Sequence, residues 1–161
     1  MIHVRWTASA LVLALVLAGT APIAVAADGT RVGAVSTTFR LVGRNDKIVV
    51  DRYDDPKVVG VSCYMSRAET GGVKGSLGLA TDPSRFSLAC RATGKVMPQG
   101  ELPDNEVVFG ESTSFFFKEL RVSRIYDRDK RVLLYLAWST KALTTGGSPY
   151  NAITAVPLDM P

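Results

Sequence analysis

The feature that most constrains the fold is a series of short runs, each apolar or alternating between apolar and polar residues, separated by turns rich in glycine and proline. Alternation with a period of two is typical of β-strands that have one face in a core. No amphipathic helical stripe is longer than two turns. The runs span residues 47–53, 58–65, 86–91, 106–109, 115–126, 131–140 and 151–156. The pattern predicts one mainly β, antiparallel domain, a sandwich or partly open barrel with little helix.

Two details of this pattern are specific predictions. Residues 93–105 contain two glycines and two prolines, and we expect them to form an exposed loop. In the run that ends at Tyr126, the alternation changes phase because Ile125 is also apolar. This change predicts a β-bulge near Ser123 and Arg124, since one extra residue re-aims the side chains that follow it.

The first 26 residues have the organisation of a Sec-type signal peptide. Arg5 precedes an apolar stretch over residues 8–19, and the small residues at 24–26 match the requirement of signal peptidase. An apolar core of about a dozen residues is shorter than the roughly 20 that a helix needs to cross a bilayer. The segment therefore predicts export and removal, not anchoring.

Cleavage is expected near Ala26 or Ala27, in which case residues 27–161 form one β domain in the periplasm. A chain of this length can bury a hydrophobic core of its own. The longest later apolar run, residues 132–138, is too short to span a membrane. We therefore expect no membrane span.

The two cysteines, Cys63 and Cys90, both lie after the signal segment. Thiols in an exported chain most often pair. Each cysteine lies on the more apolar face of its alternating run, so both sulfur atoms are expected to point into the core. A redox pair would need a C-x-x-C type of spacing, which is absent. The sequence predicts a structural disulfide.

The residue content excludes most enzyme chemistry. The only histidine is His3, inside the signal segment, so the mature chain has none for a Ser-His-Asp or Cys-His hydrolase or for the usual zinc sites. The formal net charge of +4 is a mild excess with interspersed signs, which does not favour a nucleic-acid partner. We expect no metal and no cofactor, and we assign no catalytic residue.

Three carboxylates precede Pro56: Asp51, Asp54 and Asp55. They could form an acid–base pair or a calcium site. The preferred interpretation is a polar turn, in which an aspartate caps the backbone and the proline sets φ. A carboxylate-dependent hydrolase or transferase is the alternative function.

A glycine-rich segment over residues 70–78 carries a lysine. It does not fit the Walker phosphate-binding pattern, because Lys74 precedes the glycine instead of following it. Its backbone amides could still bind a carboxylate or a phosphate together with nearby cations. The structural interpretation is a tight connection inside the disulfide loop. The candidate ligand-binding residues are Arg67, Gly71, Gly72, Lys74 and Gly75.

The three consecutive phenylalanines at residues 115–117 could form an exposed docking patch, although core packing is the preferred interpretation. We expect a monomer whose partner is a small anionic ligand or an envelope protein. A structural module that docks through aromatic residues is a third functional class.

Stretches along most of the chain match one known family. The most specific is Val61-Ser62-Cys63-Tyr64-Met65-Ser66-Arg67-Ala68; the others are residues 33–39, 47–50, 54–56, 70–72, 74–80, 90, 106–109, 126–127, 134–137, 148–149 and 151–153. Through them the chain resembles the CreA family of small bacterial periplasmic proteins. The resemblance implies a periplasmic address, a paired Cys63 and Cys90, and a link to carbon-source response. It implies no catalytic mechanism, so a non-enzymatic binding or accessory role is the leading expectation.

Overall fold

A computed structural model describes residues 29–72, 86–112, 119–139 and 150–158. Within these residues the chain forms eight strands in two four-stranded sheets, each a meander in which sequential strands pair antiparallel. The first sheet contains β1 (Thr30–Ser36), β2 (Lys47–Asp54), β3 (Val58–Glu69) and β4 (Phe86–Pro98). The second contains β5 (Glu106–Ser112), β6 (Glu119–Asp127), β7 (Val132–Ser139) and β8 (Asn151–Pro157).

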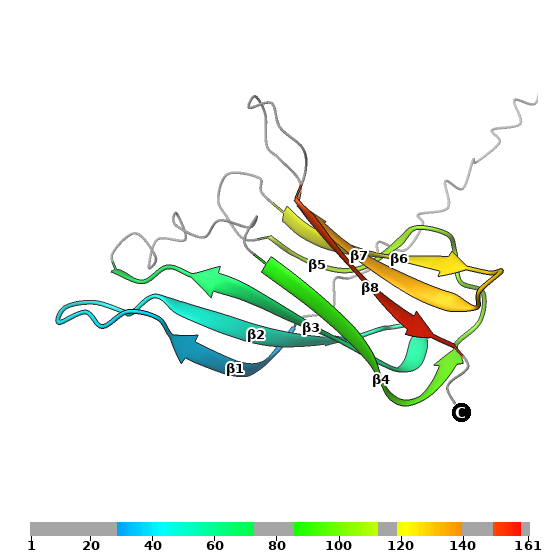
Figure 1. Ribbon diagram of the computed structural model, residues 1–161, viewed down its shortest axis with the longest axis horizontal. Helices are drawn as coiled ribbons and strands as arrows, with labels where there is room; N and C mark the ends of the chain where they lie inside the picture. The colour runs from blue at the N-terminus through cyan, green and yellow to red at the C-terminus, as the bar shows by residue number, and fades with distance from the viewer. Residues whose placement is uncertain (1–28, 73–85, 113–118, 140–149, 159–161) are drawn as a thin grey trace, which may run out of the picture.

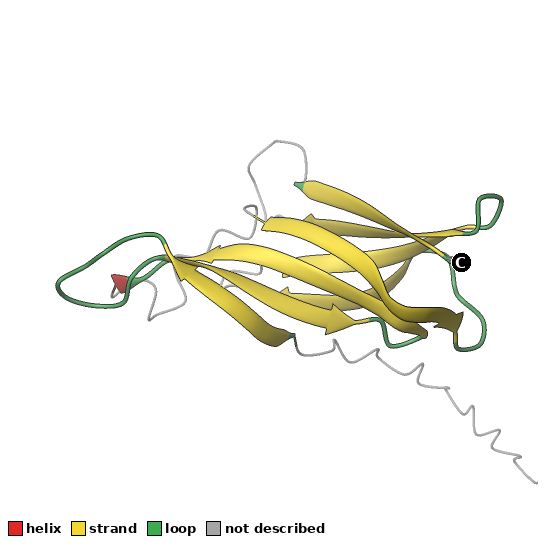
Figure 2. Ribbon diagram, turned by 60° about the horizontal axis from the view of Figure 1, so that its bottom comes forward, coloured by secondary structure: helices red, strands yellow, loops and turns green. Residues whose placement is uncertain are grey.

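The two sheets pack against each other with β4 and β8 side by side (Figures 1 and 2). The backbone N–H of Cys90 on β4 donates to Thr154 Oγ1 on β8 at 3.3 Å. Each sheet keeps its own two edge strands, so the strands do not close into a barrel. The predicted mainly β, antiparallel fold is confirmed as a two-sheet arrangement.

One hydrophobic cluster contains buried side chains from both sheets. Tyr53 on β2 stacks on Phe109 of β5, with ring centroids 4.7 Å apart and planes 5° from parallel. Such an aromatic pair adds to the apolar burial that holds two sheets together. The other buried members are Val58, Val61, Cys63, Met65, Leu88, Cys90, Leu102, Val108, Leu120, Val122, Leu133, Tyr135, Ala137 and Val156.

The disulfide predicted from the alternating pattern is present. Cys63 on β3 and Cys90 on β4 are direct cross-strand partners and are bonded through their sulfur atoms. Both residues are fully buried in the cluster shared by the two sheets. The bridge therefore joins neighbouring strands inside the core.

The strand boundaries differ from the sequence prediction in the first sheet. β1 was not predicted, because most of its residues are exposed and its sequence does not alternate. The loop expected over residues 93–105 is wrong as far as Pro98, since β4 stays paired with β3 up to that residue. Gly60 permits this pairing: its φ is +82°, and a Cβ there would lie 2.3 Å from the carbonyl oxygen of Lys95.

The β-bulge predicted near Ser123 and Arg124 is also wrong. β6 pairs with β7 in unbroken register, and the irregularity in this sheet lies on β5, between Val107 and Phe109. The apparent change of phase arises because Leu120, Val122 and Arg124 all face the core. Arg124 therefore lies where the alternating pattern predicts an apolar residue. Its side chain is fully buried.

Some sequence predictions concern residues outside the described ranges. These are the signal segment over residues 1–26, the candidate ligand-binding residues Lys74 and Gly75, and the phenylalanines at 115–117. Across the described strands and loops, no helix is long and apolar enough to cross a membrane.

Candidate functional site

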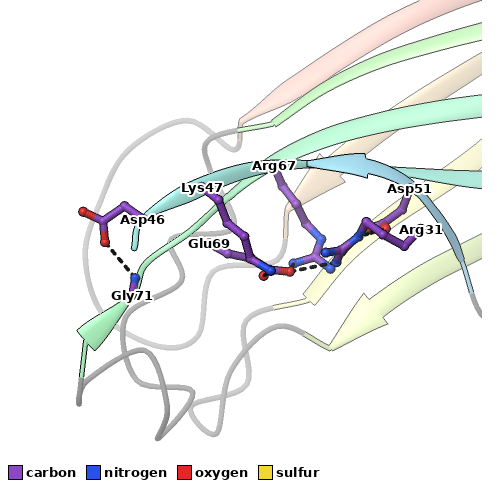
Figure 3. Close-up of polar contacts among 7 residues, drawn as sticks. All are labelled: Arg31, Asp46, Lys47, Asp51, Arg67, Glu69 and Gly71. Atoms are coloured by element: carbon purple, nitrogen blue, oxygen red, sulfur yellow. Dashed lines mark hydrogen bonds and ion pairs between the residues drawn. The ribbon is translucent and has the colours of Figure 1, made fainter. Parts of the chain in front are cut away.

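A cluster of five charged side chains covers one end of the inner face of the first sheet (Figure 3). Register explains why they share a face: Arg31 is the cross-strand partner of Asp51, and Lys47 is the partner of Glu69. Arg67 lies two residues before Glu69 on β3, so its side chain emerges on the same side. We call Arg31, Lys47, Asp51, Arg67 and Glu69 the charged cluster.

Asp51 is the buried centre of the charged cluster, with 3% of its surface exposed. Arg31 donates to it from Nε and, at 3.5 Å, from Nη2. Arg67 Nη2 also donates to Asp51, to its Oδ2 atom at 3.1 Å. A buried carboxylate needs partners of this kind, because burying an unpaired charge is costly. The bond to Asp51 is also the main reason that the pKa of Arg31 is raised.

Glu69 is the more accessible carboxylate of the charged cluster, with 21% of its side chain exposed. Its Oε1 accepts from Arg31 Nη2 at 2.8 Å and from Arg67 Nη1 at 3.1 Å, and Lys47 Nζ lies 2.9 Å from Oε2. Burial raises the pKa of Glu69, but the bonds from Lys47 and Arg31 outweigh burial and leave this pKa below its ordinary value. Three cations therefore converge on one carboxylate at the surface.

Two of the glycines predicted to bind a ligand, Gly71 and Gly72, lie beside the loop between β1 and β2. Gly71 N–H donates to Asp46 Oδ1 at 2.7 Å, and Gly72 N–H donates to the carbonyl oxygen of Arg44 at 2.9 Å. Bonds from Arg40 and from the Gly71 backbone hold the pKa of Asp46 below its usual range. The amide of Gly71 thus already binds a carboxylate, one supplied by the chain itself.

Gly71 is required at its position by close backbone packing. A Cβ there would lie 1.9 Å from the carbonyl oxygen of Arg44 and 2.6 Å from the backbone carbon of Asn45. No side chain fits at such distances, so only glycine lets the end of β3 lie against the loop.

The three aspartates before Pro56 have separate partners. Asp51 belongs to the charged cluster, and Asp54 accepts from the hydroxyl of Ser62 at 2.6 Å. Asp55 Oδ1 accepts from the backbone N–H groups of Lys57 and Val58, at 2.8 and 3.0 Å. The last arrangement is the backbone cap that the sequence predicted for this turn.

A second ionic network lies at the opposite end of the sheets, and the Arg124–Asp55 pair at its centre is buried. Arg124 donates to both carboxylate oxygens of Asp55 and also to Glu106. The hydroxyl of Tyr135 donates to Asp55 Oδ2 at 2.7 Å, and Lys57 Nζ donates to Glu106 at 2.5 Å. Burial, together with the charge of Asp55, raises the pKa of Tyr135. Since Arg124 is inaccessible, this network has a structural role.

Sequence reasoning found one of the five members of the charged cluster as a ligand-binding candidate, Arg67. It named Asp51 as a carboxylate candidate but missed Arg31, Lys47 and Glu69. Lys47 and Glu69 could have been found by counting outward from the turn at Pro56, because a hairpin's turn sets its register. Arg31 lies on a strand whose sequence has no strand signal.

The described residues contain no group of three or more histidine, cysteine or acidic side chains arranged to hold a metal ion. The charged cluster instead provides hydrogen-bond donors. The two guanidinium groups and the one ammonium group of the cluster surround the carboxylate of Glu69. Guanidinium groups bind carboxylates and phosphates through paired N–H donors. Its chemistry suits recognition of an anion.

Comparisons with known proteins agree on one family. The sequence model described as "CreA protein" matches residues 32–160. Protein CreA of Escherichia coli strain K12 is 44% identical over 152 residues, which cover 92% of this chain and 94% of that protein. The proteins of the same name from the O6:H1 and O157:H7 strains match to the same extent. No solved structure gave a significant match.

Proposed function

This chain belongs to the CreA family, and we propose that it acts as an exported, non-enzymatic protein that binds a small anion at the charged cluster. The observation that carries the proposal is the position of Glu69, whose carboxylate accepts from Arg31, Arg67 and Lys47 while remaining partly exposed. This is the donor arrangement that a ligand carboxylate or phosphate would need. Asp51, below it, holds both arginines in place.

In this mechanism Glu69 occupies the anion position when no ligand is bound. An incoming anion replaces its carboxylate between the two guanidinium groups, so Glu69 competes with the ligand. The cost of replacement is moderate, because ion pairs at a partly exposed site contribute little. Arg31 and Arg67 keep their orientation through Asp51, so the donors stay aimed at the anion.

The binding experiment is calorimetric titration with inorganic phosphate and with succinate as probes. Arg67→Ala should abolish the heat of binding, because it removes one of the two guanidinium donors. Glu69→Gln should strengthen binding, because it removes the competing charge. Lys74→Ala tests the sequence-based candidate Lys74, which lies outside the described residues.

Arg52→Gln is the matched control. Arg52 follows Asp51 on β2, so its side chain lies on the other face of the sheet. The expected result is binding equal to that of the unaltered protein. The proposal fails if neither probe titrates, or if Arg52→Gln weakens binding as much as Arg67→Ala does.

Export is supported by the signal-like segment over residues 1–26 and by the buried disulfide, which is typical of oxidising compartments. The test is the intact mass of the protein recovered from the periplasm, with and without reductant. We expect a chain that begins at Ala27 or Asp28 and gains two hydrogens on reduction. An uncleaved chain with free thiols would contradict export.

The acid–base alternative has less support. Asp51 and Asp55 are each bound by an arginine, and the two networks lie at opposite ends of the sheets. Asp54 shares no partner with either of them among the described contacts. Within the described contacts, Asp51, Asp54 and Asp55 have separate partners, whereas hydrolysis of this kind requires two carboxylates that flank one substrate position.

A further inference from the structure

The loop between β1 and β2, residues 37–46, presents apolar side chains to solvent. Phe39 is 84% exposed, Leu41 is 91% exposed and Val42 is 89% exposed. Where the loop joins the sheet, the cross-strand partners Val35 and Ile48 are also exposed. A contiguous exposed apolar patch on a protein that is otherwise able to bury its core marks an interaction surface.

The polar groups of this loop are used to hold it in shape. Thr37 N–H donates to the carbonyl oxygen of Asp46 at 2.8 Å, and Arg40 N–H donates to Asn45 Oδ1 at 2.8 Å. Gly72 N–H donates to the carbonyl oxygen of Arg44 and ties the loop to the end of β3. Several polar groups of the loop are therefore bonded within the protein while its apolar side chains are exposed, which is the reverse of an ordinary solvated loop.

The loop is also basic. Arg40 and Arg44 lie on either side of Leu41 and Val42, and both are exposed. The one acidic residue in the loop, Asp46, is bound by Arg40 and by the Gly71 backbone. Cations beside exposed apolar side chains are typical of protein segments that lie in a membrane interface.

We propose that the tip of the β1–β2 loop inserts into an anionic lipid surface. Figure 1 shows this loop at the far left, at one end of the molecule's longest axis, where it projects beyond the sheets. A projecting tip can enter a deformable lipid interface, whereas a protein partner would need a matching recess. Phe39, Leu41 and Val42 enter the acyl boundary, and Arg44 contacts the headgroup phosphates.

This proposal is independent of anion binding at the charged cluster, which uses other side chains. Insertion would orient the molecule with the end of the first sheet toward the lipid. The charged cluster would then lie near the membrane, because Lys47 directly follows the loop.

The experiment is co-sedimentation with vesicles of phosphatidylcholine alone and of phosphatidylcholine mixed equally with phosphatidylglycerol. The unaltered protein and every variant are purified from cells as the mature protein, so that all of them are compared in the same form. We expect binding to the mixed vesicles, weakened by salt. Phe39→Ser and Leu41→Ser should each weaken it by about tenfold or more. Arg44→Gln should weaken binding to the mixed vesicles about fivefold.

Ile153→Ser is the matched control, because Ile153 is 61% exposed but lies on β8 in the other sheet. Its binding should equal that of the unaltered protein. All four side chains tested are exposed, so the variants should fold, and circular dichroism checks this. The proposal is overturned if mixed vesicles bind no protein, or if the loop variants bind as well as the control. It is also overturned if Leu41→Ser changes the oligomeric mass without lipid, which would make a second copy the occupant.

Discussion

Arg124 on β6 donates from Nη1 to both carboxylate oxygens of Asp55, at 2.5 and 2.7 Å. Both side chains are fully buried. Asp55 lies in the turn between β2 and β3, so the ion pair connects the first sheet to the second. The Tyr135 hydroxyl and the backbone amides of Lys57 and Val58 satisfy the remaining capacity of the carboxylate.

Asp55→Ala should destabilise the protein by about 3–5 kcal/mol, because it leaves Arg124 as a buried charge with one carboxylate partner fewer. Replacing both residues, as in Asp55→Ala with Arg124→Met, should cost less than the single change. Urea unfolding of the variants measures these differences. Asp54→Ala is the control, since the Asp54 side chain is 62% exposed, and it should cost less than about 1 kcal/mol. A double variant no more stable than Asp55→Ala would contradict the pairing.

Reduction of the Cys63–Cys90 disulfide should lower the free energy of unfolding by about 3–4 kcal/mol, the chain-entropy value for two residues 27 apart in sequence. Unfolding in guanidinium with and without reductant measures this difference. Cys63→Ala with Cys90→Ala should be insensitive to reductant. If the unaltered protein unfolds at the same guanidinium concentration with and without reductant, the disulfide does not stabilise the folded protein.

Stability should fall in acid partly through Glu69. The pKa of Glu69 is lower in the folded protein than its ordinary value of 4.5, so the unfolded chain takes up this proton first as pH falls. The ionised Glu69 contributes fully to the free energy of unfolding above about pH 4.5, and this contribution is lost as the pH falls through the pKa of Glu69 in the folded protein. Glu69→Gln should therefore reduce the slope of unfolding free energy against pH between about pH 5 and 3. Equal slopes for variant and parent, from urea unfolding at several pH values, would refute this.

Gly71→Ala should destabilise the protein by about 1–3 kcal/mol, because its Cβ would overlap the backbone of Arg44 and push the loop away. Gly33→Ala is the matched control, since a Cβ at Gly33 meets no atom within 4 Å. That change should stay within about 1 kcal/mol of the unaltered protein. Thermal unfolding compares the two variants, and similar losses for both would show that the close contact at Gly71 is unimportant.

The strands that were predicted correctly have sequences that are rich in apolar residues, as in β2 and β7, or that alternate, as in β3 and β4. The structure buries Val49, Asp51 and Tyr53 at every second position of β2, and Leu133, Tyr135 and Ala137 at every second position of β7. The disulfide followed from the alternation around Cys63 and Cys90. β1 has no such pattern because its residues are mostly exposed, and so Arg31 was missed.

The sequence by itself determined the β class, seven of the strands in outline, the pairing of Cys63 with Cys90 and the cap at Asp55. Each of these depends on the pleat or on the few residues around a turn. Arg67 was also identified as a candidate from its basic side chain beside a glycine-rich segment.

Only the tertiary structure decided which charges are buried and which converge. In the sequence, Arg124 interrupts an alternating pattern, and nothing nearby indicates that its charge is buried. Its carboxylate partner Asp55 is 69 residues away in sequence. Arg31 meets Glu69 across 38 residues, through a shared register with β2. A charge can enter a core or join a cluster only where opposite charges have been brought to it, and that depends on how distant strands pair and pack.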